Sequence, residues 1–134
     1  LHDALPILEK PIVNDSVDRV TLREDRLVLA GDPHGVWMVR EHGSGVRYYT
    51  DLYFKTVGSM PSRMIEVANN AAIGAALAAG FGCSLVSAAA VPAGVPTREL
   101  GDEFVRRFYA LVPRSGLTPG QRELAGRVIA ALRG

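Results

Sequence analysis

The sequence has one cysteine, Cys83, and a formal net charge of only +1 over 134 residues. A single cysteine cannot form an internal disulfide, and this fits a reducing cytoplasm, where we expect the protein to act. His34 and His42 have no cysteine or carboxylate partner at metal-ligand spacing, so we expect no metal and no other cofactor. A nearly balanced charge also gives no electrostatic reason for this chain to bind nucleic acid by itself.

The sequence also lacks a recognisable catalytic set. Ser44 lies in Gly-Ser-Gly, which differs from the Gly-x-Ser-x-Gly elbow of serine hydrolases. Glu41 and Glu66 are the one acidic pair that we would place near the same strand ends, and their spacing does not bring them together. We therefore expect no enzymatic activity.

No membrane-spanning segment is expected, although residues 71–91 carry no charged side chain. About 20 apolar residues suffice to span a bilayer. Most residues of this run are Ala, Gly or Ser, however, and Gly80-Phe81-Gly82 interrupts it where a helix would end. The pattern favours a buried helix, a tight turn and a buried strand. The first residues show no basic region followed by an apolar core, so no signal peptide is expected.

Short apolar segments separated by turn residues predict an α/β fold with a mostly parallel sheet. A turn is expected at Glu24-Asp25, and the apolar run that begins at Phe108 predicts a strand covered on both faces. The strand, helix and strand within residues 64–87 predict two parallel strands side by side, joined by a right-handed crossover. The expected strands are residues 17–22, 27–30, 36–40, 64–68, 83–87 and 104–112.

Two helices are predicted between these strands. Residues 46–57 repeat apolar side chains at helical spacing, and Gly58 should end this helix. Residues 70–79 should form the second helix, with Ile73 and Leu77 on one face.

A third helix is predicted near the C-terminus. Thr118 can cap it, Pro119 would be its first residue, and Gln121 completes a Thr-x-x-Gln capping box. Its apolar stripe, which we expect to be buried, consists of Leu124, Val128, Ala131 and Leu132.

A glycine-rich turn before the first helix predicts a ligand site. Gly43, Ser44 and Gly45 let the backbone turn sharply, so that free N–H groups and the Ser44 hydroxyl point at one place, which suits an anion. Val46 continues this motif, and Arg47 can add a charged fork of donors one turn into the helix. Two other interpretations stay open: Ser44 could only cap the helix, and Arg47 could be a surface arginine.

A second candidate site lies where the second helix begins. Asn69 and Asn70 are both plausible caps, and a capped helix start also presents free N–H groups that a ligand could use. The complete set of candidate ligand-binding residues is Gly43, Ser44, Gly45, Val46, Arg47, Asn69 and Asn70, and a small anionic metabolite is the expected ligand.

Three segments, in this order, resemble the effector-binding domain of LysR-type transcriptional regulators. The first is Arg40-Glu41-His42-Gly43-Ser44-Gly45-Val46-Arg47, where many members of that family read R-E-x-G-S-G-T-R, so that Val46 replaces Thr. The second runs from Glu66-Val67-Ala68-Asn69-Asn70 to Phe81-Gly82-Cys83-Ser84-Leu85-Val86-Ser87, and the third is Arg107-Phe108-Tyr109-Ala110-Leu111-Val112-Pro113-Arg114. The resemblance covers most of residues 15 to 134.

This resemblance implies a truncated, periplasmic-binding-protein-like (type 2) fold, with a mostly parallel sheet and flanking helices. Residues 33–103 would form lobe two, and residues 17–32 and 104–134 would be crossing strands and remnants of lobe one. A small metabolite would bind between the lobes and change the DNA binding of an N-terminal winged helix-turn-helix that this chain lacks. The full-length regulator would be a cytoplasmic dimer or tetramer with no membrane contact.

A second function of a different class stays open. A solute-binding protein of a transporter, of the phosphate or oxyanion type, has the same lobed architecture, and such proteins also use Ser-Gly-Thr turns at helix starts. The first seven residues, 1–7, match the translation of a common sequencing-adapter end. We expect them to be an artefact fused to a partial gene, so that the partial domain begins at residue 8.

Overall fold

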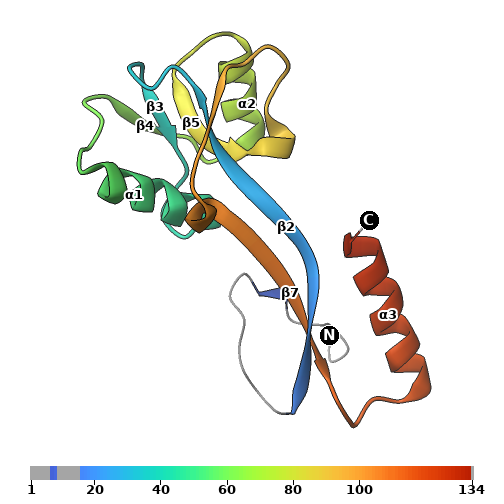
Figure 1. Ribbon diagram of the computed structural model, residues 1–134. Coiled ribbons are helices and arrows are strands. Elements are labelled where there is room, and N and C mark those ends of the chain that lie inside the picture. The colour runs from blue at the N-terminus through green and yellow to red at the C-terminus, as the bar shows by residue number, and fades with distance from the viewer. Residues whose placement is uncertain (1–6, 9–15, 134) are drawn as a thin grey trace. The chain divides into compact units, whose positions relative to one another are not determined.

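The computed structural model of the chain describes residues 7–8 and 16–133 (Figure 1). The chain divides into two compact units: Arg26–Val105 forms one, and Leu1–Asp25 with Arg106–Gly134 forms the other. Both divisions fall in or beside long strands, β2 (Val17–Gly31) and β7 (Val105–Pro113). The lobe boundaries drawn from the sequence stay a prediction.

The sheet of the unit Arg26–Val105 has the strand order β2-β5-β3-β4. β3 (Trp37–Val39) runs parallel to both of its neighbours, β5 (Cys83–Ser87) and β4 (Met64–Glu66). β2 pairs antiparallel with β5 and also with the short strand β6 (Thr97–Glu99). The predicted α/β class is confirmed, and the sheet is mixed.

Helices cover both faces of this sheet. α1 (Gly45–Val57) leads from β3 to β4 over one face, and α2 (Asn70–Ala78) leads from β4 back past β3 to β5 over the other face (Figure 1). β3 therefore separates β4 from β5, and the prediction that those two strands lie side by side is wrong. A crossover fixes the direction of the next strand but leaves open how many strands it passes.

The three residues of β3 divide the core between the two faces. Trp37 and Val39 are buried with α1, where the Trp37 ring lies 4.9 Å from that of Phe54 in an edge-to-face arrangement. Met38 points the other way and packs against Ile73 of α2. This alternation follows from the two-residue repeat of a strand. It means that the central strand is shared by both cores.

Two glycines allow three backbone segments to approach one another closely at the amino end of β3. Gly31 and Gly82 have φ values of 91° and 61°. A Cβ on Gly31 would lie 2.2 Å from the Gly82 carbonyl oxygen, and one on Gly82 would lie 2.3 Å from that of Val36. Only glycine fits both the conformation and the space.

The predicted helix ends are confirmed for α1 and α2. Gly58 follows α1 with φ 77° and donates its amide to Phe54, and Gly80 has φ 81° after α2. The uncharged run 71–91 thus folds mainly as α2, a turn and β5. Within residues 7–8 and 16–133, none of the helices has both the length and the apolar character needed to cross a membrane.

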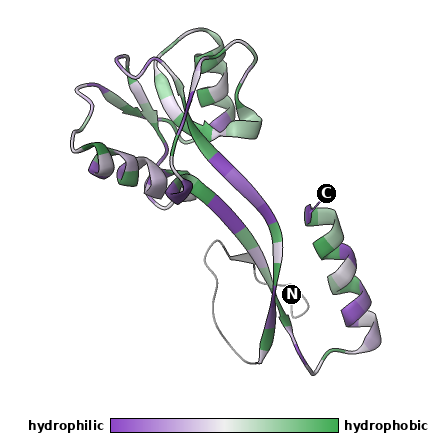
Figure 2. Cartoon of the chain, in the orientation of Figure 1, coloured by the Kyte–Doolittle hydropathy of each residue, from purple (hydrophilic) through white to green (hydrophobic). Residues whose placement is uncertain are grey.

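The other unit contains β1 (Ile7–Leu8), which pairs antiparallel with β7, and β7 neighbours β2. The predicted turn at Glu24-Asp25 is wrong, because β2 continues through both residues. Arg107 Nε lies 3.0 Å from Glu24 Oε1, and Arg106 Nη2 lies 2.6 Å from Asp25 Oδ2. These pairs compensate the charges within the strand. Figure 2 shows that β2 and β7 both contain hydrophilic stretches. Of the predicted artefact 1–7, residues 1–6 lie outside the described residues.

α3 (Pro119–Arg133) begins with the predicted capping box. The Thr118 amide donates to Gln121 Oε1 at 2.9 Å, and the Gln121 amide donates to Thr118 Oγ1 at 3.1 Å. The prediction of a buried stripe is wrong for the described residues, since Ala125 is the buried side chain of this helix. β7 is likewise only partly buried along most of its length, so it is not covered on both faces. The exposed stripe consists of Leu124, Val128, Ala131 and Leu132.

Candidate functional site

Both predicted site segments lie at the carboxyl edge of the parallel strands. β3 and β4 are parallel neighbours, so the turn before α1 and the turn before α2 leave the sheet at the same edge. The two helices then run over opposite faces. In open α/β sheets, the crevice outside such a point, where neighbouring strands lead to opposite faces, is the usual ligand position.

The turn before α1 presents donors that none of the described residues accepts from. Ser44 is the N-cap of α1 in an extended conformation, and its side chain makes no capping hydrogen bond. Its carbonyl accepts from the Arg47 amide at 3.0 Å, whereas the Gly45 and Val46 amides have no acceptor in the described part of the chain. Gly43 has φ 96° with open space around it. The Ser44 hydroxyl and two amides are therefore available to a ligand.

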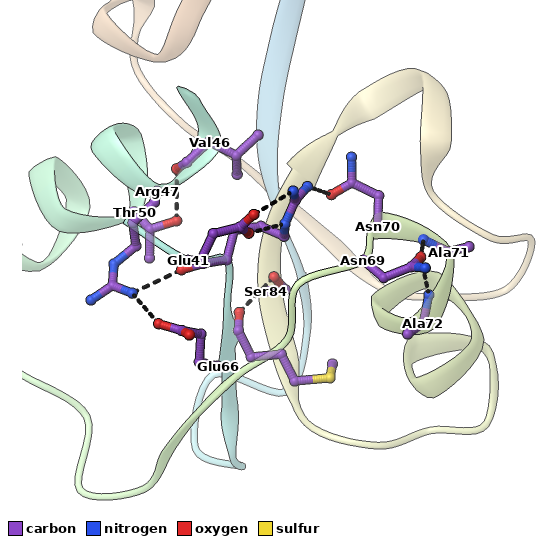
Figure 3. A network of polar contacts seen from close by, with 12 residues as sticks. Glu41, Val46, Arg47, Thr50, Glu66, Asn69, Asn70, Ala71, Ala72 and Ser84 are labelled. Carbon is purple, nitrogen blue, oxygen red and sulfur yellow. Dashed lines mark hydrogen bonds and ion pairs between the residues drawn. The ribbon is translucent and has the colours of Figure 1, made fainter. Parts of the chain in front are cut away.

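Arg47 is a buried side chain with several partners (Figure 3). Its Nε donates to Asp51 Oδ1 at 3.0 Å, one helical turn further along α1. Its Nη1 donates to the Arg40 carbonyl at 2.8 Å and lies 3.8 Å from Glu66 Oε1. Arg47 is thus not a surface arginine, and it ties the turn after β3 to the end of β4. Its Nη2 has no hydrogen-bond partner among the described residues.

Asn69 and Asn70 have different roles at the start of α2. Asn69 caps the helix, because its Oδ1 accepts from the amides of Ala71 and Ala72 at 2.7 and 3.2 Å. Asn70 instead accepts a hydrogen bond through Oδ1 from Arg40 Nη1 at 2.6 Å. This contact joins the start of α2, drawn in Figure 3, to the residue that follows β3.

Arg40 is the residue of this region that the sequence-based set omitted. It follows β3 immediately, and its Nε and Nη2 donate to the Glu41 carboxylate at 2.7 and 3.2 Å. The hydrogen bonds from Arg40 hold the pKa of Glu41 below its ordinary value, and the same contact raises the pKa of Arg40. Its position at the strand end, three residues before Gly43, was the available signal.

The histidines and the cysteine lie outside this arrangement. His34 and His42 are exposed, and the residues that the structure describes contain no cluster of three or more His, Cys, Asp or Glu able to hold a metal. Cys83 is fully buried in β5, and burial raises its pKa to about 12. The thiol is therefore protonated at neutral pH and is no nucleophile.

A hollow of about 150 Å³ lies at the opposite end of β3. Its lining includes Trp37, Tyr53, Val57 and Met60. None of the residues that line it is charged. We therefore place the candidate site at the carboxyl edge, where polar groups converge.

The family model of the LysR substrate binding domain matches residues 5–133 of the chain. No curated protein matches the sequence significantly.

Solved structures of regulator domains share the fold. The regulatory domain of Synechocystis PCC6803 CcmR in complex with 2-PG is 22% identical, with 97% of this chain and 74% of that chain covered and a TM-score of 0.67. The QuiR effector-binding domain in complex with shikimate is 13% identical, with coverages of 95% and 70% and a TM-score of 0.65. Full-length CbnR complexed with its target DNA is 17% identical, with coverages of 97% and 53% and a TM-score of 0.62. The chain thus spans about half of that full-length regulator.

Proposed function

The chain belongs to the LysR substrate-binding domain family, and from this we propose that it is the effector-sensing part of a bacterial LysR-type transcriptional regulator. It has the periplasmic-binding-protein-like (type 2) fold of such domains in truncated form. The effector is a small anionic metabolite, bound at the carboxyl edge of β3 and β4. The observation that carries this proposal is the convergence of two helix starts with the unused Ser44 hydroxyl and the unused Gly45 and Val46 amides.

The proposed ligand contacts follow from these free groups. Gly43 allows the turn, while Ser44, Gly45 and Val46 donate to the anion, as helix N-termini do for phosphates and carboxylates. Arg47 adds its free Nη2 and holds the turn in place. Asn69 fixes the start of α2, and Asn70 offers its Nδ2, since Arg40 engages its Oδ1.

In the full-length protein, effector binding would modulate DNA binding by an N-terminal winged helix-turn-helix. We propose a cytoplasmic dimer or tetramer that contacts DNA only through that domain and catalyses no reaction. CbnR has been solved in complex with its target DNA, and CcmR and QuiR domains with small molecules, which supports this assignment. The transporter alternative is not favoured, because the matching family is the LysR substrate binding domain and the similar structures named above are those of regulators.

The site assignment can be tested by isothermal titration calorimetry of the full-length protein against small carboxylates and organic phosphates. With the tightest ligand found, Ser44→Ala combined with Arg47→Ala should weaken binding by about 1 to 3 kcal/mol, the range for losing charge-assisted hydrogen bonds. Ser44→Ala alone should account for part of this loss. Ser62→Ala, on an exposed serine in the loop after α1, is the matched control and should bind like wild type. Equal affinities for wild type and the double variant would refute the assignment.

A further inference from the structure

We propose that the Glu41 carboxylate occupies on Arg40 the place that the effector's anionic group takes, so that the effector binds by displacing Glu41. This inference rests on the proposed function, because it concerns the same site. It assigns Arg40 as the residue that selects for anions and Glu41 as an internal competitor.

Arg40 stands between the two halves of the site. Its Nη1 is held by Asn70 at the start of α2, and its backbone carbonyl is held by Arg47 of α1. The guanidinium is therefore held against the start of α2, while the backbone of the same residue is held by α1. The Arg40 side chain is 18% exposed, so its charge is close to the surface without being free to move into solvent.

Glu41 is suited to leave. The hydrogen bonds that its carboxylate accepts from other described residues come from Arg40, and its side chain is 40% exposed. An exposed ion pair contributes little net free energy, since water replaces each partner readily. Glu41 lies two residues before Gly43, which has a positive φ and no Cβ. The space around Gly43 is open, so this turn can move without a clash there.

Arg47 is placed differently. Its guanidinium donates to the Asp51 carboxylate and to the Arg40 carbonyl and lies close to Glu66. The Arg47 side chain is only 10% exposed. An anion that accepts from Arg47 Nη2 would still face the Asp51 and Glu66 carboxylates, which remain in place, so Arg47 cannot exchange one carboxylate for another. At Arg40 the incoming anion replaces the carboxylate that leaves, so the guanidinium stays paired before and after binding. Neutral analogues cannot make this exchange.

The test uses acetate, its neutral analogue acetamide, and inorganic phosphate as probes, with binding to the 134-residue chain followed by the amide NMR signals of residues 43–47. Glu41→Gln should bind acetate and phosphate about two- to fivefold tighter than wild type, the change expected for removing an exposed ion pair. Acetamide binding should not change. Arg40→Gln should lose the preference for acetate over acetamide, a readout that a purely structural role would not move.

Glu99→Gln, an exposed carboxylate on β6, removes the same charge away from the site and should bind the anions like wild type. Equal anion affinities for wild type and Glu41→Gln, or an equal gain in Glu99→Gln, would overturn the displacement of Glu41 and leave the proposed function standing. Failure of wild type and of Glu41→Gln to bind either anion at residues 43–47 would overturn both proposals.

Discussion

Replacing Arg47 by methionine should destabilise the unit Arg26–Val105 even without a ligand. The variant keeps an unbranched side chain in a buried position but removes the guanidinium, which donates to the Arg40 carbonyl at 2.8 Å. A hydrogen bond from a charged group contributes about 1.5 to 3 kcal/mol. The pair with the half-exposed Asp51 adds only about 0.3 to 0.5 kcal/mol, as other such pairs one helical turn apart do. We therefore expect a loss of about 2 to 3 kcal/mol.

The single tryptophan reports on this loss. Trp37 is 4% exposed and contacts Phe54 of α1, so its fluorescence should change when this unit unfolds. Thermal unfolding should shift down by roughly 6 to 12 °C, taking about 3 to 4 °C per kcal/mol for a domain of this size. Arg63→Met is the matched control, because Arg63 is exposed and its side chain makes no hydrogen bond or ion pair with the other described residues. An unchanged midpoint for Arg47→Met would refute the structural role of Arg47.

Two further perturbations probe the glycine turns and the buried thiol. Gly31→Ala should lower the free energy of unfolding in urea by at least about 3 kcal/mol, because its Cβ would lie 2.2 Å from a backbone oxygen and the residue has a positive φ. Gly43→Ala should lower it by only about 1 to 2 kcal/mol, the cost of the left-handed conformation, because a Cβ there has open space. Similar losses would contradict the close packing at Gly31. Cys83 should not react with a thiol reagent at pH 8 until the chain unfolds. The contribution of its buried thiol to the free energy of unfolding should be lost as the pH rises from 9.0 towards 12, because the thiol of the unfolded chain ionises first. Rapid labelling of the folded chain would show that this thiol is accessible.

Local signals predicted the helices and their ends well. Gly58 and Gly80 adopt the positive φ that ends a helix, and the Thr118 capping box forms as its spacing indicates. Each of these signals lies within a few residues of the structure that it specifies. The turn expected at Glu24-Asp25 failed for the opposite reason. Its charges are compensated by Arg106 and Arg107, about 80 residues away, which no local pattern reveals.

The same limit applies to the candidate site. The glycine motif marked the turn that presents the unused Ser44 hydroxyl, and Asn69 marked the cap of α2. Arg40 was missed because its partner Asn70 lies 30 residues further along the chain. The contact exists only because β3 and β4 are parallel neighbours, and the sequence placed β4 beside β5 instead. Strand order is a property of the whole sheet that short windows do not contain.

The shortness of β3 has an evolutionary consequence. Alternate residues of this three-residue strand point to opposite faces of the sheet and pack in different cores. Inserting or deleting one residue within it would therefore turn Met38 towards α1 and Trp37 towards α2. Descendants of this gene can exchange His42, the variable position of the R-E-x-G-S-G motif, without that penalty, because its side chain is exposed. New ligand preferences should therefore arise by changes in the turns that follow β3 and β4, while the length of β3 itself stays constant across lineages.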